Sequence, residues 1–426
     1  MTSKTIFFKN SLYNITTNFV FSIIFFIPYL LNKYYLNIHE LAALSLAQNY
    51  LEFFIYLFYF LRISTVVFLG KAFGAKNTED ITVGYVKGLI FAFFLGILGS
   101  FILRSIPVRA GNSPLVLLQA KEYIHIASLG FPFVLMNFIN FGAYLALQKK
   151  ILLLIHTFIY VVIYILITFI HIHYFQNGIL GLAGNFSIFP VFNFFFGYIL
   201  LRKNFNFSLL SVKKIFYNIQ EYISFNQTLL LRSFLIEVSY LSYIYTISFF
   251  HEKAFILYSF SLRLLFFFTT FLESFLYTFE SLGTQALGEK NKEKFIQLIK
   301  NNLFVSTLAT LLCLGIIVLS FSSLIHIFNI PIESLHFFRY GVLCISIALV
   351  FSNFTYIYEG ILISFEKSKA LLIGTFFGTI FLLSCFYLSY RFQFFEGVWI
   401  GMIGFYIIKT GIYKYYSVGA LTSNLD

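Results

Sequence analysis

The chain has 426 residues, of which 59% are hydrophobic and only 11% charged, and its formal net charge at pH 7 is +12. A soluble protein of this composition would expose more apolar surface than water tolerates. The composition therefore excludes a soluble globular fold and indicates an integral membrane protein.

Apolar stretches follow one another along the whole chain. A spanning helix needs about 20 apolar residues, because lipid offers no partner to backbone polar groups. Roughly twelve stretches reach this length, so we expect an all-α membrane protein. They lie near residues 12–31, 43–69, 83–104, 123–147, 151–174, 179–201, 224–250, 254–280, 296–321, 338–363, 370–390 and 396–416. The first is too long for a signal peptide and no cleavage site follows it, so we expect it to be span one.

The basic residues are distributed unevenly between the two predicted sides of the membrane. If the N-terminus is cytoplasmic, 19 of the 29 Lys and Arg fall on that side, seven on the other, and Arg62, Arg232 and Arg263 within spans. Cytoplasmic loops of membrane proteins carry such an excess. We therefore expect both termini in the cytoplasm, a bacterial inner (plasma) membrane location, and no nucleic-acid partner.

The sequence repeats itself with a period near half its length. Residues 71–77 (KAFGAKN) recur as residues 285–291 (QALGEKN), at an offset of 214. Residues 142–155 (GAYLALQKKILLLI) resemble residues 360–373 (GILISFEKSKALLI), at an offset of 218. Residues 177–181 (NGILG) resemble residues 396–401 (EGVWIG) in the same order. Three ordered matches indicate a duplicated unit of six spans.

An even number of spans keeps its orientation when it is duplicated. We therefore expect two six-helix lobes related by a pseudo-two-fold axis along the membrane normal, as in transporters with parallel repeats. The predicted divisions are an N-terminal lobe over residues 1–201, a cytoplasmic linker over residues 202–222 and a C-terminal lobe over residues 223–426.

Several segments resemble the MATE family of multidrug and toxic-compound extrusion proteins, in its DinF-like branch. Segments FLRIST (60–65) and GKAFGA (70–75) resemble the second span and the loop after it. LGFP (129–132) is similar to a fourth-span segment, and Asn226 with LRS (231–233) to the entry of the seventh span. ESLGTQALG (280–288) is similar to the end of the eighth span. The similarity runs in order over nearly the whole chain.

This resemblance implies a twelve-span, two-lobe antiporter driven by protons or Na⁺. It would export small organic compounds, cationic or amphipathic, by alternating access. We expect a monomer in the lipid bilayer whose partners are small-molecule substrates, with no cofactor other than the coupling ion.

Two carboxylates are the first candidates for coupling. Glu237 lies in the middle of the seventh predicted span and Glu359 in the tenth. By the resemblance, both would line the C-terminal lobe and form a cation or proton site. Charged groups within a bilayer are costly and usually face a cavity or a partner. The alternative is a structural ion pair with an intramembrane arginine.

Other intramembrane polar groups are secondary candidates. Glu273 and Glu280 are about two helical turns apart and so share a face, where pairing with an arginine or a loop lysine is the structural alternative. Glu52, Arg62, Arg232 and Asn226 are candidates for anchoring helices.

The N-terminal lobe departs from the family pattern. Many MATE proteins carry an acidic residue in span one, but this position falls on Pro28, and residues 12–31 contain no acid. Either the C-terminal carboxylates carry the coupling, or coupling in this chain differs from the usual pattern of the family.

No motif for enzymatic chemistry is present. The sequence has no GxxxxGK[ST], HExxH or GxSxG segment, so we expect neither ATP hydrolysis nor another enzyme activity. His171 and His173 point about 200° apart on a helix and cannot chelate one metal, and the three cysteines are widely separated within apolar runs. A lipid-linked precursor flippase of the same superfamily, or a membrane scaffold without transport activity, are the alternative functions.

Overall fold

The computed structural model describes residues 3–35, 37–106, 114–173, 178–249, 252–327, 335–392, 394 and 396–425. Within these ranges the regular structure is helical throughout. The long helices are α1 (Ser3–Tyr35), α2 (Ile38–Leu57), α3 (Phe60–Gly74), α4 (Thr78–Ser105), α5 (Pro114–Ala127), α6 (Phe131–Ala146), α7 (Lys150–His173), α8 (Gly178–Leu201), α10 (Ile219–Ser248), α11 (Glu252–Gly288), α12 (Lys292–Ile327), α13 (Leu335–Ser364), α14 (Ser368–Phe392) and α15 (Gly397–Leu425). Short helical turns are η1 (Ser128–Gly130), η2 (Arg202–Asn204), η3 (Phe207–Leu209) and α9 (Val212–Phe216).

The helices occupy the apolar stretches predicted from the sequence. By length and composition, 8 helical segments of the described chain can cross a membrane. Helices α1, α10, α11 and α15, of 33, 30, 37 and 29 residues, take the places of the other predicted spans. The prediction of an all-α membrane protein is confirmed.

Two of the predicted spans are each built from two helices. The second breaks at Phe58 and Tyr59, between α2 and α3. The fourth consists of α5, the turn η1 and α6, with Pro132 in the first turn of α6. Proline is tolerated there because the first turn has no partner for its backbone N–H. Each of these two crossings therefore contains an internal helix end.

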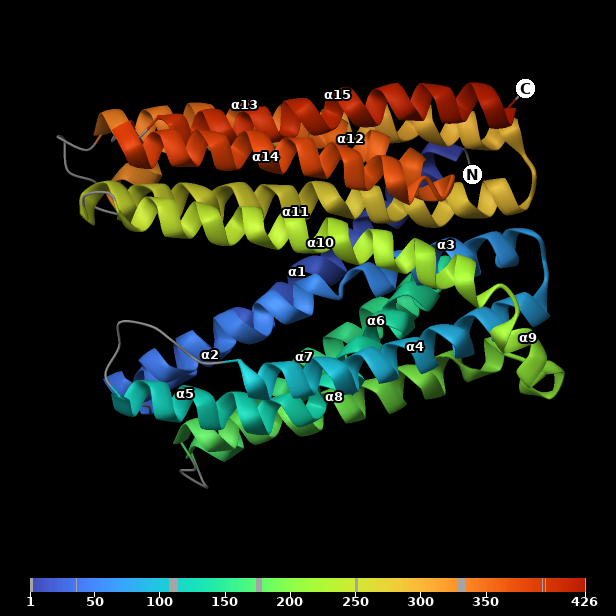
Figure 1. The fold of residues 1–426 in the computed structure, drawn as a ribbon, viewed down its shortest axis with the longest axis horizontal. Coiled ribbons are helices and arrows are strands. Elements are labelled where there is room, and N and C mark those ends of the chain that lie inside the picture. The colour runs from blue at the N-terminus through green and yellow to red at the C-terminus, as the bar shows by residue number, and fades with distance from the viewer. Residues whose placement is uncertain are drawn as a thin grey trace. The chain divides into compact units, whose positions relative to one another are not determined.

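The described chain forms two compact units. One comprises Tyr13–Asn226, and the other Met1–Leu12 together with Gln227–Asp426. We call them the N-terminal unit and the C-terminal unit. In Figure 1, α11 to α15, coloured yellow to red, run side by side as one bundle within the C-terminal unit.

The boundaries differ from those expected at residues 201 and 223. The expected linker packs on α4: the backbone N–H of Asn206 donates to Thr82 Oγ1 at 3.0 Å, and Lys214 forms an ion pair with Glu79. The first residues of α1 cluster with the C-terminal unit, where Ser11 Oγ donates to Thr278 Oγ1 at 3.2 Å. Segments 202–222 and 1–12 are therefore parts of the units' packing.

The sequence repeat reappears as repeated backbone geometry. Lys76 and Lys290, 214 residues apart, have φ values of 56° and 55°, and Gln148 and Glu366, 218 apart, have 55° and 58°. Each of these residues lies two positions after the last residue of a helix, and the next residue donates its N–H to a carbonyl five positions back, at 2.8 to 3.0 Å. Such left-handed turns cap helix C-termini by satisfying free carbonyls. The two units thus reverse direction by the same device at matching positions.

Candidate functional site

Four charged side chains gather inside the C-terminal unit, and we call them the charge cluster. They are Arg232 on α10, Glu273 on α11, Glu359 on α13 and Lys409 on α15. Arg232, Glu359 and Lys409 are only 6, 3 and 4% exposed. Two positive and two negative groups cancel formally, which lowers the cost of burying them together.

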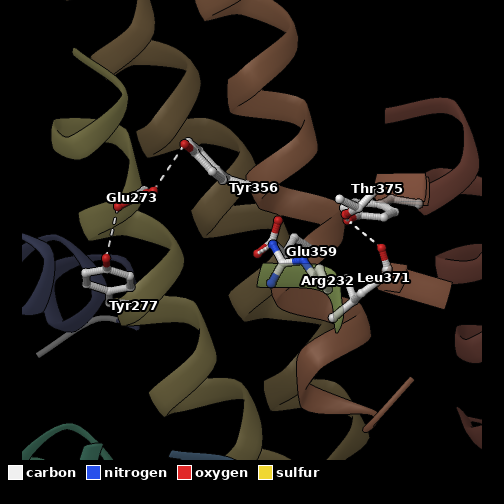
Figure 2. Close-up of polar contacts among 8 residues, drawn as sticks. Arg232, Glu273, Tyr277, Tyr356, Glu359, Leu371 and Thr375 are labelled. Carbon is white, nitrogen blue, oxygen red and sulfur yellow. Dashed lines mark hydrogen bonds and ion pairs between the residues drawn. The ribbon is translucent and has the colours of Figure 1, made fainter. Parts of the chain in front are cut away.

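Glu359 is held by an arginine from another helix. Its Oε1 forms an ion pair and hydrogen bond with the Arg232 guanidinium, across 127 residues of sequence (Figure 2). Among the described residues, no hydrogen-bond donor reaches the other oxygen, Oε2, which is buried. The carboxylate is therefore half satisfied, with one oxygen open to a proton or a cation.

Glu273 accepts hydrogen bonds from two tyrosines. Tyr277 donates to its Oε2 at 3.0 Å from the same helix, and Tyr356 donates to its Oε1 at 3.3 Å from α13. Figure 2 shows Glu273 between these two rings. Because Tyr356 and Glu359 lie on one helix three positions apart, α13 connects both carboxylates of the cluster.

Lys409 is the residue that sequence reasoning missed. It lies within the predicted span 396–416 but was not among the candidate site residues; it is 4% exposed and lies within electrostatic reach of Glu359, Arg232 and Glu273. Its Nζ is 4.9 Å from the ring centroid of Phe405. Apolar residues both before and after it in the span (GFYIIKTGIY, 404–413) were the available signal.

Tyr413 links the cluster to α14. Its hydroxyl is 2.9 Å from Thr375 Oγ1, donates to the backbone carbonyl of Leu371 at 3.0 Å, and lies within hydrogen-bonding reach of Arg232. Helices α10, α11, α13, α14 and α15 are thereby joined through one polar network.

The two primary candidates, Glu237 and Glu359, lie on different helices, α10 and α13. Glu237 is half-buried on α10, five positions after Arg232. Five residues turn a helix by about 500°, so Glu237 points about 140° away from Arg232. Arg232, rather than Glu237, holds Glu359, which is the arrangement named as the structural alternative. The coupling roles of Glu237 and Glu359 remain predictions.

The secondary candidates lie at separate places. Glu280 has no exposed surface and lies two turns after Glu273 on α11. Glu52 is half-buried on α2, and Arg62 is 1% exposed on α3 with its guanidinium 5.0 Å from the Tyr59 ring centroid. Asn226 is buried in the N-terminal unit, where its Nδ2 donates to the carbonyl of Tyr222 at 2.8 Å. The side chains of Pro28 and Arg263 lie outside the described residues.

The N-terminal unit contains a cavity of about 200 Å³. Side chains of α1, α2, α6, α7 and α8 line it, and most are aromatic or aliphatic. Its polar lining consists of amides, hydroxyls and one imidazole; no Asp, Glu, Lys or Arg is among its described lining residues. These polar residues are Thr17, Asn18, Tyr59, Asn137, His156, Thr157, Tyr160, Tyr164 and Asn193.

The cavity and the charge cluster occupy equivalent positions in the duplicated sequence. The offset of 214 relates Glu273 to Tyr59, and the offset of 218 relates Tyr356, Glu359 and Thr375 to Phe138, Phe141 and Thr157. Tyr59, Phe138, Phe141 and Thr157 all line the cavity. Matching positions of the repeat thus contribute to a buried ionic network in one unit and line a neutral cavity in the other.

Comparison with known proteins supports the resemblance to the MATE family. Residues 14–200 match the family model MatE, whereas no curated protein sequence matches. An outward-facing multidrug resistance MATE family transporter of the MOP superfamily superposes with a TM-score of 0.87 at 14% identity, covering 100% of this chain and 97% of that one.

Two further solved structures share the fold. A MOP superfamily transporter from Pyrococcus furiosus, described as having a binding pocket of reverse polarity, has a TM-score of 0.84 at 16% identity, with 100% and 97% of the two chains covered. The eukaryotic MATE transporter AtDTX14 has a TM-score of 0.84 at 14% identity, with 98% and 96% covered. The match to the MatE family model over residues 14–200, and the fold that the whole chain shares with solved MATE transporters, agree with the resemblance seen in the sequence.

Proposed function

We propose that this chain is a secondary active antiporter that exports small organic compounds in exchange for H⁺ or Na⁺ by alternating access. It would work as a monomer in a bacterial inner membrane, with both termini cytoplasmic. The DinF-like branch of the family remains our expectation from the sequence.

The half-satisfied carboxylate of Glu359 carries the proposal. A buried acidic oxygen without a donor is costly, and binding a proton or Na⁺ there would relieve that cost. The charge cluster is the part of the C-terminal unit where a coupling ion can bind among fixed charges and be released again. Glu237 and Glu273 are the other carboxylates that we propose for this exchange.

Ion binding at Glu359 would act on the helices that carry the cluster. Protonation of the carboxylate weakens its ion pair with Arg232, which ties α13 to α10. The hydrogen bond from Tyr356 to Glu273 ties the same α13 to α11. Loading and unloading one ion can therefore shift α13 between two sets of contacts, which is the bistable element that coupling needs.

The test is flux in proteoliposomes under an imposed H⁺ or Na⁺ gradient, with ethidium as the cationic and quinoline as the uncharged test compound. We expect gradient-dependent flux from the wild type and at least a tenfold loss in Glu359→Gln, because glutamine cannot exchange an ion. Glu237→Gln, assayed in parallel, reports whether that carboxylate belongs to the coupling site.

Glu289→Gln is the matched control. Glu289 forms a surface ion pair with Lys294 at 2.7 Å, and such pairs contribute little. Its flux should equal that of the wild type. Absence of flux from correctly folded wild type under both gradients would overturn the antiport proposal and favour the flippase or scaffold alternatives.

A further inference from the structure

The cavity of the N-terminal unit has the chemistry of a binding site that the charge cluster does not use. Its volume of about 200 Å³ exceeds the roughly 150 Å³ of a cavity that holds one benzene molecule. The space therefore suits a compact ligand of one or two fused aromatic rings.

The lining favours rings over chains. Tyr160, Tyr164 and Phe189 form an aromatic wall, with T-shaped contacts of Phe189 to Tyr160 at 5.9 Å and to Tyr164 at 5.2 Å between centroids. Aromatic side chains attract ligand rings by offset or edge-on contact.

His156 is the polar anchor of the cavity. It is 5% exposed, and its ring lies between Tyr144 and Phe196, at 5.5 and 5.3 Å between centroids. Asn193 lies within reach of its ring, whereas its buried Nε2 meets no hydrogen-bond partner among the described residues. A ligand in the cavity can supply that partner, which removes the cost of an unsatisfied buried nitrogen.

The electrostatic surroundings disfavour a cationic ligand. The described lining carries no acidic side chain, and residues 131–200, which supply most of it, contain none in their sequence. Glu52 lies one turn before Ile55 on α2, but only Ile55 lines the cavity. The ring of Tyr59, which lines the cavity, also contacts a positive charge, the guanidinium of Arg62 at 5.0 Å from the ring centroid. A cation would lose its hydration without gaining a counter-charge.

We propose that this cavity binds an uncharged one- or two-ring aromatic compound, hydrogen-bonded to His156 Nε2. This inference rests on the proposed export function for its role as the cargo site. It narrows the cargo from cationic or amphipathic compounds to uncharged aromatic ones. Binding itself needs no gradient, so it can be measured separately from transport.

The experiment compares quinoline with N-methylquinolinium, which has nearly the same shape but a fixed positive charge. Titration calorimetry uses the full chain in lipid nanodiscs at pH 7.5 without a gradient. We expect quinoline to bind at least tenfold more tightly than the cation. Equal or tighter binding of N-methylquinolinium would overturn the proposal, whatever the transport assay shows.

Two variants locate the site. Thr157→Phe fills the cavity and should abolish quinoline binding, whereas Phe158→Leu, at a neighbouring side chain that is 59% exposed, should leave it unchanged. His156→Phe keeps an aromatic ring but removes the hydrogen-bonding nitrogen Nε2. The ligand that pairs with Nε2 is quinoline if Nε2 carries the proton and 2-naphthol if it does not. That ligand should bind the variant roughly two- to tenfold more weakly. Naphthalene, which makes no hydrogen bond, should bind equally to the wild type and to His156→Phe. Undiminished quinoline binding to folded Thr157→Phe would show that the ligand binds elsewhere and would refute the assignment.

Discussion

At the scale of single residues, the ion pair of Arg232 with Glu359 dominates the electrostatics of the C-terminal unit. Both side chains are more than nine-tenths buried, so each depends on the other for compensation of its charge. Removing one partner from a buried pair typically costs about 3–5 kcal/mol, while replacing both can be neutral. The pair is therefore a sensitive point for stability as well as for coupling.

A double-mutant cycle separates these two roles. We expect Arg232→Gln to lower the free energy of unfolding by about 3–5 kcal/mol, because Glu359 is left buried without its partner. The double variant Arg232→Gln/Glu359→Gln should recover most of that loss and still lack coupled transport. Thermal unfolding in detergent and proteoliposome flux measure the two quantities. Additive losses from the single variants would contradict a direct interaction.

At the scale of helices, two glycines at matching repeat positions permit close packing. A Cβ on Gly142 of α6 would lie 2.8 Å from the backbone oxygen of Arg62 on α3. A Cβ on Gly360 of α13 would lie 2.7 Å from a ring carbon of Phe279 on α11. Small residues at such crossings let helices in membranes approach. In each unit, the glycine sets the distance between the helix before a repeated turn and its neighbour.

Alanine substitution at these glycines should have graded effects. Gly142→Ala meets backbone, which cannot rotate away, and should destabilise the protein by about 1–3 kcal/mol. Gly360→Ala meets a side chain and should cost less. Gly315 of α12 has nothing within 4 Å, so Gly315→Ala should stabilise the helix by up to about 1 kcal/mol. Thermal unfolding of the three variants ranks their stabilities. An equal loss of stability at positions 142 and 315 would contradict the prediction.

At the scale of the whole molecule, the two units share a chain path but differ in their interiors. The turns at Lys76 and Lys290 have the same backbone conformation. The interior of one unit holds two acidic and two basic groups, and the other holds a neutral cavity. Under the two proposals made above, ion exchange belongs to one unit and ligand binding to the other.

The orientation of the whole chain in the membrane can be tested with reporter fusions. A fluorescent protein at the C-terminus should fold and fluoresce, because we expect that end in the cytoplasm on the basis of the excess of lysine and arginine there. Alkaline phosphatase fused after residue 110, in the predicted external loop, should be active. The reverse pattern would show the opposite orientation.

The sequence by itself determined the helices, their order and the duplication. Apolar stretches of spanning length, and turns with recurring residues, are local properties that one chain segment carries within itself. The resemblance to MATE proteins likewise depended on short segments such as 60–65 and 280–288. Each of these features depends on residues that lie close together in the sequence.

Only the tertiary structure decided which polar groups meet. Glu359 pairs with Arg232 across 127 residues of sequence. Lys409 is buried, although other charged residues follow it near the end of the sequence. The partner of a buried charge depends on helix rotation and packing between distant segments, which hydropathy does not encode. The neutral cavity was likewise beyond the sequence, because its lining comes from α1, α2, α6, α7 and α8, which only the tertiary packing brings together.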